Sequence, residues 1–206
     1  VVSADSMQIY KYMDIGTAKP TKDEMDGVVH HMIDIVTPDV NFSVAEYCNM
    51  AHDVISDITK RGKLPILAGG TGLYINSVVN DVSFERAEQD ENLRKELEEY
   101  ANSAGADALH KLLAECDPES AKKIHANNIK RVIRAIEVFR TTGERLSEHN
   151  EKSKEIASRY NPVMMEILWE RDELYERINK RVDIMIEQGL EEETKKLYEM
   201  GYTKDL

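Results

Sequence analysis

The chain has 206 residues, of which 41% are hydrophobic and 32% charged, a balance typical of a globular protein. Its formal net charge of −12 argues against a broad nucleic-acid-binding surface, although it leaves room for a local basic stripe. The two cysteines, Cys48 and Cys116, form no CxxC pair, so the sequence indicates neither a disulfide framework nor zinc spacing and favours a reducing, cytoplasmic compartment. No apolar run approaches the roughly 18 residues of a membrane span, and we expect no membrane partner.

The first part of the chain alternates strand and helix signals. Residues 1–4 ("VVSA"), 31–36 ("HMIDIV") and 64–68 ("LPILA") are the strand candidates. A capping-box pattern, Ser43 with Glu46, opens a helix that we expect to end at Gly62. A "GGTG" turn then leads into the helical stretch "LYINSVV". This order predicts a parallel sheet built from β-α-β units.

Beyond residue 84 the strand signals almost disappear. Amphipathic patterns predict helices in "DENLRKELEEYANSA", "ADALHKLLAEC", "DPESAKKIH" and "NNIKRVIRAIEVFRTT". The polar stretch 146–162 is interpreted as a linker, and residues 163–169 ("VMMEILW") as a returning strand. Two more helices should end at Gly189 and Gly201.

This layout predicts an α/β core with a helical insert. We expect residues 1–84 to form the first part of the core, 85–160 an all-helical insertion, and 161–206 the return to the core. Two further features are interpreted as structural. Met164, Met165 and Trp169 are expected in the core, and the acidic run 191–193 on a solvated helix face.

Asp5, in the stretch "SADS", is the first candidate for chemistry. Ligands of open parallel sheets bind beyond the carboxyl ends of the strands, which is where Asp5 lies. A carboxylate there can accept a proton, hold Mg²⁺, or cap the next helix or turn, and the local pattern alone leaves these roles open. Gln8, close by, carries an amide that could read a base edge.

Thr71, in "LAGGTG", is the second candidate. Glycines between a buried strand and a helix allow backbone N–H groups to face an anion, and the Thr71 hydroxyl could bind a phosphate. The pattern is no Walker A motif, and a tight structural turn remains the alternative.

Two helices carry clustered cations. Lys130, Arg131 and Arg134 share a face that could contact a phosphate backbone, or could simply be solvated. Arg177 and Arg181 lie four residues apart, so they could clamp a diphosphate or pair with acids one turn away.

Taken together, four motifs resemble the bacterial tRNA dimethylallyltransferase family, also called tRNA isopentenylpyrophosphate transferases. They are "SADSMQIYKYMDIGTAKP", "LAGGTGLY", "KRVIRAIEVF", and "LYERINKRVD" followed by "EQGLEEE". The resemblance implies a P-loop-kinase-like parallel sheet core with an all-helical insertion domain that grips the tRNA anticodon stem-loop. The implied reaction moves a dimethylallyl group from dimethylallyl diphosphate to N6 of the adenosine 3′ of the anticodon, in tRNAs reading codons that begin with U.

The resemblance also implies roles for individual residues. Asp5 matches the general base, Thr71 the residue that steadies the bridging oxygen of the diphosphate, and Arg177 and Arg181 the diphosphate-side arginines. Mg²⁺ is the implied cofactor, with its protein ligands unknown. The residues matched to tRNA contact are Asp5, Ser6, Met7, Gln8, Arg94, Lys130, Arg131, Val132, Ile133 and Arg134.

One part of the family pattern is absent from the sequence, a phosphate-binding loop of the type GPTASGKT, which we expect upstream of Val1. Three other interpretations remain open: an adenylate dimethylallyltransferase acting on free nucleotide, a small-molecule kinase, and a non-catalytic RNA-binding module. The helical insert favours tRNA over a mononucleotide, and the net charge argues against a purely RNA-binding role. We expect the protein to be a monomer.

Overall fold

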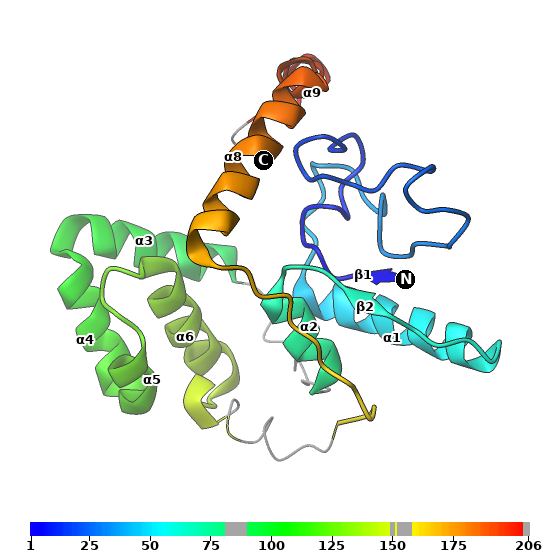
Figure 1. The fold of residues 1–206 in the computed structure, drawn as a ribbon. Coiled ribbons are helices and arrows are strands. Elements are labelled where there is room, and N and C mark those ends of the chain that lie inside the picture. Colours follow the sequence, from blue (N-terminus) through cyan, green and yellow to red (C-terminus); the bar gives the residue numbers. More distant parts are fainter. Residues whose placement is uncertain (81–89, 149–150, 152–157, 204–206) are drawn as a thin grey trace. The chain divides into compact units, whose positions relative to one another are not determined.

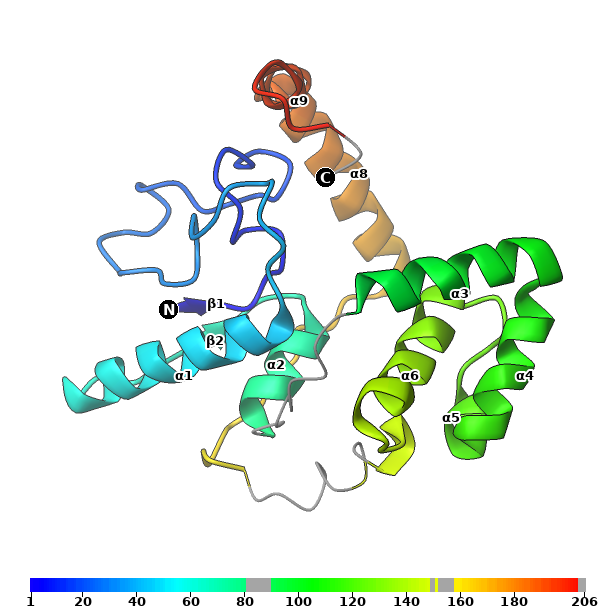
Figure 2. The same ribbon diagram turned by 180° about the vertical axis from the view of Figure 1, so that it is seen from behind.

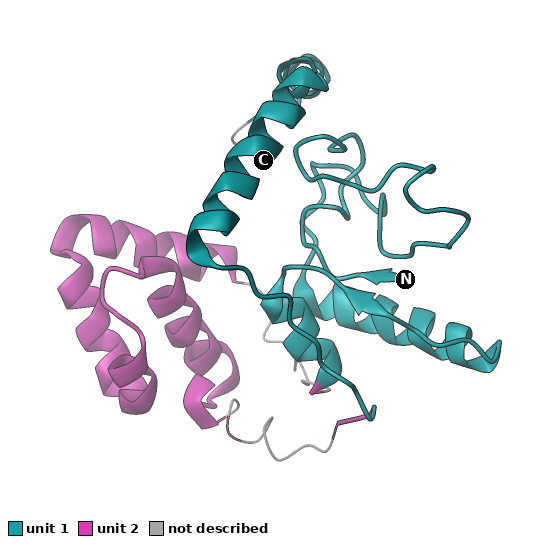
Figure 3. Cartoon of the chain, viewed as in Figure 1, with its two compact units in different colours: residues 1–79, 160–206 teal, residues 80–159 magenta. Residues whose placement is uncertain are grey.

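Figure 1 traces the chain in a computed structural model that describes residues 1–80, 90–148, 151 and 158–203. The chain divides into two compact units, residues 1–79 with 160–206 and residues 80–159 (Figure 3). The boundary expected between residues 84 and 85 lies outside the described residues. So do residues 149–150 and 152–157 of the stretch interpreted as a linker. No helix in the described residues is long and apolar enough to cross a bilayer.

The first unit contains a short parallel sheet. Strand β1 (Val2–Ser3) pairs with β2 (Leu67–Ala68), which confirms the predicted parallel pairing. The candidate strand at 31–36 is wrong as a continuous strand, because only isolated bridges form at its two ends. The backbone is left-handed at Met32 (φ 64°) and Asp34 (φ 55°), and this conformation breaks the pleat of a strand.

Two helices of the first unit pack on each other beside β1 and β2, as Figure 1 and Figure 2 show. Helix α1 (Val44–Lys60) begins with the predicted capping box, and α2 (Gly72–Val79) follows the glycine-rich turn. Their contact is centred on the stacked rings of Tyr47 and Tyr74, whose centroids lie 3.9 Å apart. Both tyrosines are buried. Their packing therefore stabilises the edge of the sheet at which the candidate site lies.

The later part of the first unit is helical, as predicted, but lacks the returning strand. Helices α8 (Arg171–Glu187) and α9 (Leu190–Glu199) are separated by Gly189, whose φ of 100° suits glycine. Residues 163–169 form no strand, because no backbone group of the described residues hydrogen-bonds to them. Met164, Met165 and Trp169 are exposed (62%, 89% and 43%), so the expectation that they are core residues is wrong for the described structure.

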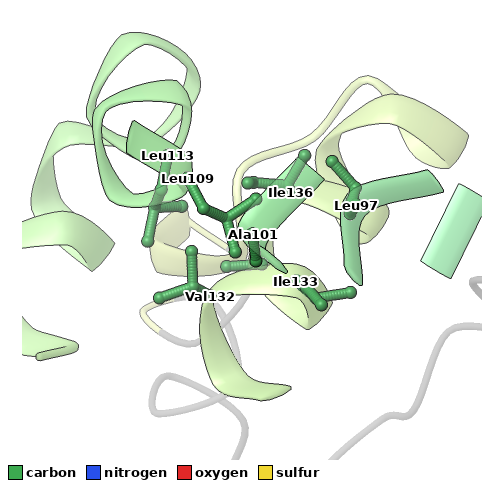
Figure 4. Packing of buried hydrophobic residues seen from close by; sticks show 8 residues of the cluster. Leu97, Ala101, Leu109, Leu113, Val132, Ile133 and Ile136 are labelled. Atoms are coloured by element: carbon green, nitrogen blue, oxygen red, sulfur yellow. The ribbon is translucent and has the colours of Figure 1, made fainter. Parts of the chain in front are cut away.

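The second unit consists of helices α3 (Glu91–Ala104), α4 (Ala106–Cys116), α5 (Pro118–Lys123) and α6 (Ile129–Thr142). Figure 2 shows α4 and α6 side by side, and α3 packs on both of them. Side chains of Asp90, Asp117 and Asn128 cap the starts of α3, α5 and α6. Figure 4 shows the shared apolar core, and its labelled members are Leu97, Ala101, Leu109, Leu113, Val132, Ile133 and Ile136.

Candidate active site at the end of the first strand

Asp5 lies two residues beyond β1, and its two carboxylate oxygens have different roles. Its Oδ1 accepts hydrogen bonds from the backbone N–H of Met7 (2.8 Å) and, more weakly, of Gln8 (3.3 Å). This is the turn-capping geometry of aspartate, one of the roles that the sequence left open. Oδ2 accepts no hydrogen bond from any described residue. One oxygen therefore fixes the side chain, and the other is available to a ligand.

Thr71 lies next to this turn although it is 65 residues away along the chain. Its Oγ1 accepts the backbone N–H of Ser6 at 2.9 Å and lies 3.2 Å from the Ser6 hydroxyl oxygen. The backbone N–H of Thr71 donates to the carbonyl oxygen of Ala4 at 3.0 Å. The fold thus brings the two predicted catalytic residues, Asp5 and Thr71, into one cluster with Ser6, hereafter the strand-end cluster.

Gly69 explains why this cluster needs the glycine-rich turn. A Cβ at Gly69 would lie 2.4 Å from both the carbonyl carbon and the oxygen of Ala4. No side chain fits at that distance, so only glycine lets the turn reach the strand end. Gly70 is different, since a Cβ there would meet nothing within 4 Å. The close approach at Gly69 sets the distance between Asp5 and Thr71.

Gln8 is engaged by the chain itself. Its Oε1 accepts the Ser3 hydroxyl at 2.9 Å, and its Nε2 donates to the carbonyls of Thr17 and Ala18, both at 3.2 Å. The amide therefore joins the strand end to the loop of residues 12–19. A contact between Gln8 and adenine, as the resemblance implies, would have to share or displace these bonds. Met7 differs, because its side chain is exposed (45%).

Glu193 of α9 holds the 12–19 loop from the other side, which the sequence did not indicate. Its carboxylate accepts the backbone N–H groups of Asp14 (2.8 Å), Ile15 (2.7 Å) and Gly16 (3.0 Å). The interpretation of residues 191–193 as a solvated face is therefore wrong for Glu193. A solvated acid and a loop-binding acid look the same in a helical pattern, so no sequence signal separated them.

Lys19 is a second loop anchor that the sequence did not reveal. Its side chain is only 5% exposed, and Nζ donates to Asp14 (2.7 Å), Asp34 (2.6 Å) and the carbonyl of Tyr10 (2.9 Å). A buried ammonium requires such partners, because an uncompensated charge is costly away from water. The loop beside Asp5 is therefore held by Gln8, Lys19 and Glu193 together.

The two buried tyrosines behind the strand end are uncharged at neutral pH. Burial raises the pKa of Tyr74 to about 12 and raises that of Tyr47 still further. The Tyr47 hydroxyl donates to the Ser3 carbonyl at 2.8 Å. Tyr47 thus satisfies a buried backbone oxygen immediately before the strand-end cluster.

The predicted diphosphate-side arginines lie on α8. The Arg177 guanidinium lies over the Trp169 ring, 3.5 Å from its centroid, which is a cation–π contact. Neither arginine forms an ion pair with Glu173 or Glu176 in the described structure, so the alternative of pairing within the helix is wrong here. No hydrogen bond among the described residues joins either arginine to the strand-end cluster.

The residues matched to the tRNA-contacting helix separate into two groups. Lys130 and Arg131 are exposed and Arg134 is half-buried, so their charges face solvent at least in part. Val132 (0% exposed) and Ile133 (3%) belong to the apolar core. Their side chains are therefore unavailable to RNA, which corrects that part of the expectation.

A metal ion finds no ready-made site in the described part of the chain. No group of three or more His, Cys, Asp or Glu side chains there could hold one. Mg²⁺ often binds through one or two carboxylates together with phosphate oxygens of a substrate. The described residues thus form no Mg²⁺ site without a substrate, and Mg²⁺ stays a prediction.

The chain is similar to known proteins. A family model described as IPP transferase matches residues 8–206. A tRNA dimethylallyltransferase of Acetivibrio thermocellus is 53% identical over 204 residues, which cover 99% of this chain and 65% of that relative.

Two solved structures are also similar. The tRNA isopentenylpyrophosphate transferase of Bacillus halodurans superposes with a TM-score of 0.64 at 49% identity, over 98% of this chain and 62% of that one. A eukaryotic dimethylallyltransferase acting on tRNA gives a TM-score of 0.81 at 31% identity, over 99% and 50%. The chain thus spans slightly less than two thirds of the length of the curated relative described above.

Proposed function

The chain belongs to the IPP transferase family, and we propose that it forms part of a tRNA dimethylallyltransferase. The proposed reaction transfers a dimethylallyl group from dimethylallyl diphosphate to N6 of the adenosine 3′ of the anticodon, in tRNAs that read codons beginning with U. The core would then be P-loop-kinase-like, with β1 and β2 as two of its parallel strands. The observation that carries the proposal is the Asp5 carboxylate, fixed through Oδ1 and open at Oδ2, beside Thr71.

Asp5 is the proposed general base. The N6 lone pair attacks C1 of the dimethylallyl group while the bond from C1 to the diphosphate oxygen breaks, and the electron pair leaves with diphosphate. Asp5 Oδ2 accepts the proton that N6 loses. The adenine must leave the anticodon stack to reach this carboxylate, as in other enzymes that act on a base. The exposed Met7 side chain, adjacent in the turn, offers an apolar surface to the extruded base.

The leaving diphosphate is the proposed ligand of the Thr71 side of the cluster. The paired hydroxyls of Thr71 and Ser6 can donate a hydrogen bond to a diphosphate oxygen as negative charge develops there. Arg177 and Arg181 are proposed to act on the same anion. The cation–π contact with Trp169 would orient the Arg177 guanidinium.

Transfer from labelled dimethylallyl diphosphate tests the proposal, in a protein of the relatives' full length that carries this sequence. An anticodon stem-loop RNA and AMP serve as alternative acceptors, since incorporation into AMP alone would favour the free-nucleotide enzyme. Incorporation into neither acceptor, with RNA still bound, would favour a non-catalytic RNA-binding role. Asp5→Asn keeps the oxygen that caps the turn but removes the base. We therefore expect a single-turnover rate at least about 100-fold lower, with RNA binding retained.

A further inference from the structure

Glu137 of α6 is a fully buried acid that the proposed chemistry does not use. Its side chain is 0% exposed, yet its carboxylate receives hydrogen bonds from two helices and from a helix start. Oε1 accepts Nε of Arg94 at 2.8 Å and the backbone N–H of Asp90 at 3.0 Å. Oε2 accepts Nη2 of Arg94 at 3.0 Å and Nη1 of Arg134 at 2.6 Å.

These bonds keep Glu137 charged despite its burial. Burial by itself raises the pKa of this carboxyl, but the hydrogen bonds from Arg94 and Arg134 outweigh burial, and the net pKa is lowered. The fork of Arg94 grips both carboxylate oxygens, which fixes the plane of the carboxylate as well as its position. A rigid anion of this kind can in turn hold a second guanidinium in one orientation.

Arg134 is the guanidinium that this anion holds. Its side chain is 39% exposed, and it lies one turn beyond Lys130 and Arg131 on the same helix. An unrestrained arginine on a surface samples many rotamers, and binding a phosphate would cost the entropy of fixing one of them. The hydrogen bond to Glu137 already restrains the Arg134 guanidinium in the folded protein. Part of the entropy cost is therefore met in folding and not in RNA binding.

We propose that Glu137 is a positioning residue for RNA, which presents the Arg134 guanidinium to a backbone phosphate while Arg94 of α3 braces the carboxylate. This inference rests on the proposed function, because it takes the anticodon stem-loop as the ligand. A buried acid would thus favour the binding of a polyanion, although its negative charge by itself repels one. Removing a negative charge beside two arginines should strengthen RNA binding if charge alone matters. The inference predicts weaker binding instead.

Fluorescence anisotropy with a labelled anticodon stem-loop RNA, over a series of salt concentrations, shows whether the loss of this charge weakens or strengthens RNA binding. For Glu137→Gln we expect about tenfold weaker binding at low salt, and a plot of log affinity against log salt that is shallower by about one phosphate contact. Glu96→Gln is the matched control. It removes an acid from the exposed pair with Arg140 (3.6 Å), so binding should be unchanged or slightly tighter.

A double-mutant cycle shows whether Glu137 acts through Arg134. In an Arg134→Ala background, Glu137→Gln should cost little further affinity, whereas an equal loss in both backgrounds would overturn the inference. Binding by Glu137→Gln that matches or exceeds that of the unmodified protein would overturn it as well.

Arg134→Lys keeps the test decisive if Glu137→Gln fails to fold, as judged by its thermal unfolding. The lysine retains the charge on a half-exposed position but loses the planar fork. Weaker RNA binding at unchanged charge supports the inference, and unchanged binding contradicts it. Failure of the unmodified protein to bind the stem-loop would count against the proposed function itself.

Discussion

Replacing Gly69 by alanine tests whether close backbone approach builds the strand-end cluster. The new Cβ would lie 2.4 Å from the Ala4 carbonyl carbon and oxygen and 2.9 Å from its Cα, where ordinary contact begins at 3.4 Å. The turn must therefore retreat by about 1 Å, at an overpacking cost of about 1–3 kcal/mol. The retreat also strains two hydrogen bonds, Ala4 N–H to Ala68 (2.7 Å) and Thr71 N–H to Ala4 (3.0 Å), each contributing about 1 kcal/mol. We expect a total loss of about 3 kcal/mol.

Hydrogen exchange of the Ala4 and Thr71 amides reports this loss directly, because both groups donate across the junction. A loss of about 3 kcal/mol corresponds to exchange about 100-fold faster. Gly70→Ala is the matched control, since its Cβ would meet nothing within 4 Å. In this variant the exchange rates of the Ala4 and Thr71 amides should change less than about threefold. Equal protection in Gly69→Ala and the unmodified chain, or equal losses in both variants, would refute the steric argument.

Three other substitutions test further contacts in the two units. Tyr47→Phe should lower the free energy of unfolding by about 1–2 kcal/mol in urea titration, because it leaves a buried strand carbonyl without its 2.8 Å donor; an unchanged midpoint would contradict this. Glu193→Gln should speed amide exchange at residues 14–16 about tenfold, whereas Glu191→Gln, which forms no hydrogen bond to the loop in the described part of the chain, should not. The lowered pKa of Glu137 means that its contribution to stability is complete above its ordinary value of 4.5 and is lost as pH falls below it. Melting temperatures between about pH 6 and pH 3.5 should therefore fall less steeply in Glu137→Gln, and parallel curves would argue against the ion pairs.

Local chemistry explains which elements the sequence predicted well. The capping box of Ser43 and Glu46 marks the start of α1, and the left-handed glycines Gly143 and Gly189 follow the ends of α6 and α8. Each signal acts within a few residues, between a side chain and the nearest backbone groups. The amphipathic helix α6 was predicted for the same reason, because helical spacing alone decides which residues share a face.

The errors concern features that depend on distant parts of the chain. Residues 31–36 and 163–169 are β-prone, but a strand exists only where a neighbour supplies hydrogen bonds. Glu193 appeared to be one of three equivalent acids, and it is distinguished only by a loop almost 180 residues upstream.

The candidate site contains features that the sequence predicted and features that it did not. Asp5 and Thr71 were predicted from a strand end and a glycine-rich turn, and the fold brings them together through Ser6. The engagement of Gln8 with Ser3 and the 12–19 loop was not predictable, because an amide suits a base edge and a carbonyl equally well.

Single-turnover transfer of the dimethylallyl group to the stem-loop RNA by Asp5→Asn, compared with the unmodified full-length protein, decides whether Asp5 is the base. The amide retains an oxygen to accept the N–H groups of Met7 and Gln8, so the turn should persist and RNA should still bind. We expect a transfer rate at least about 100-fold lower with RNA affinity within about twofold. A rate within a few-fold of the unmodified protein would contradict the assignment of Asp5 as the base.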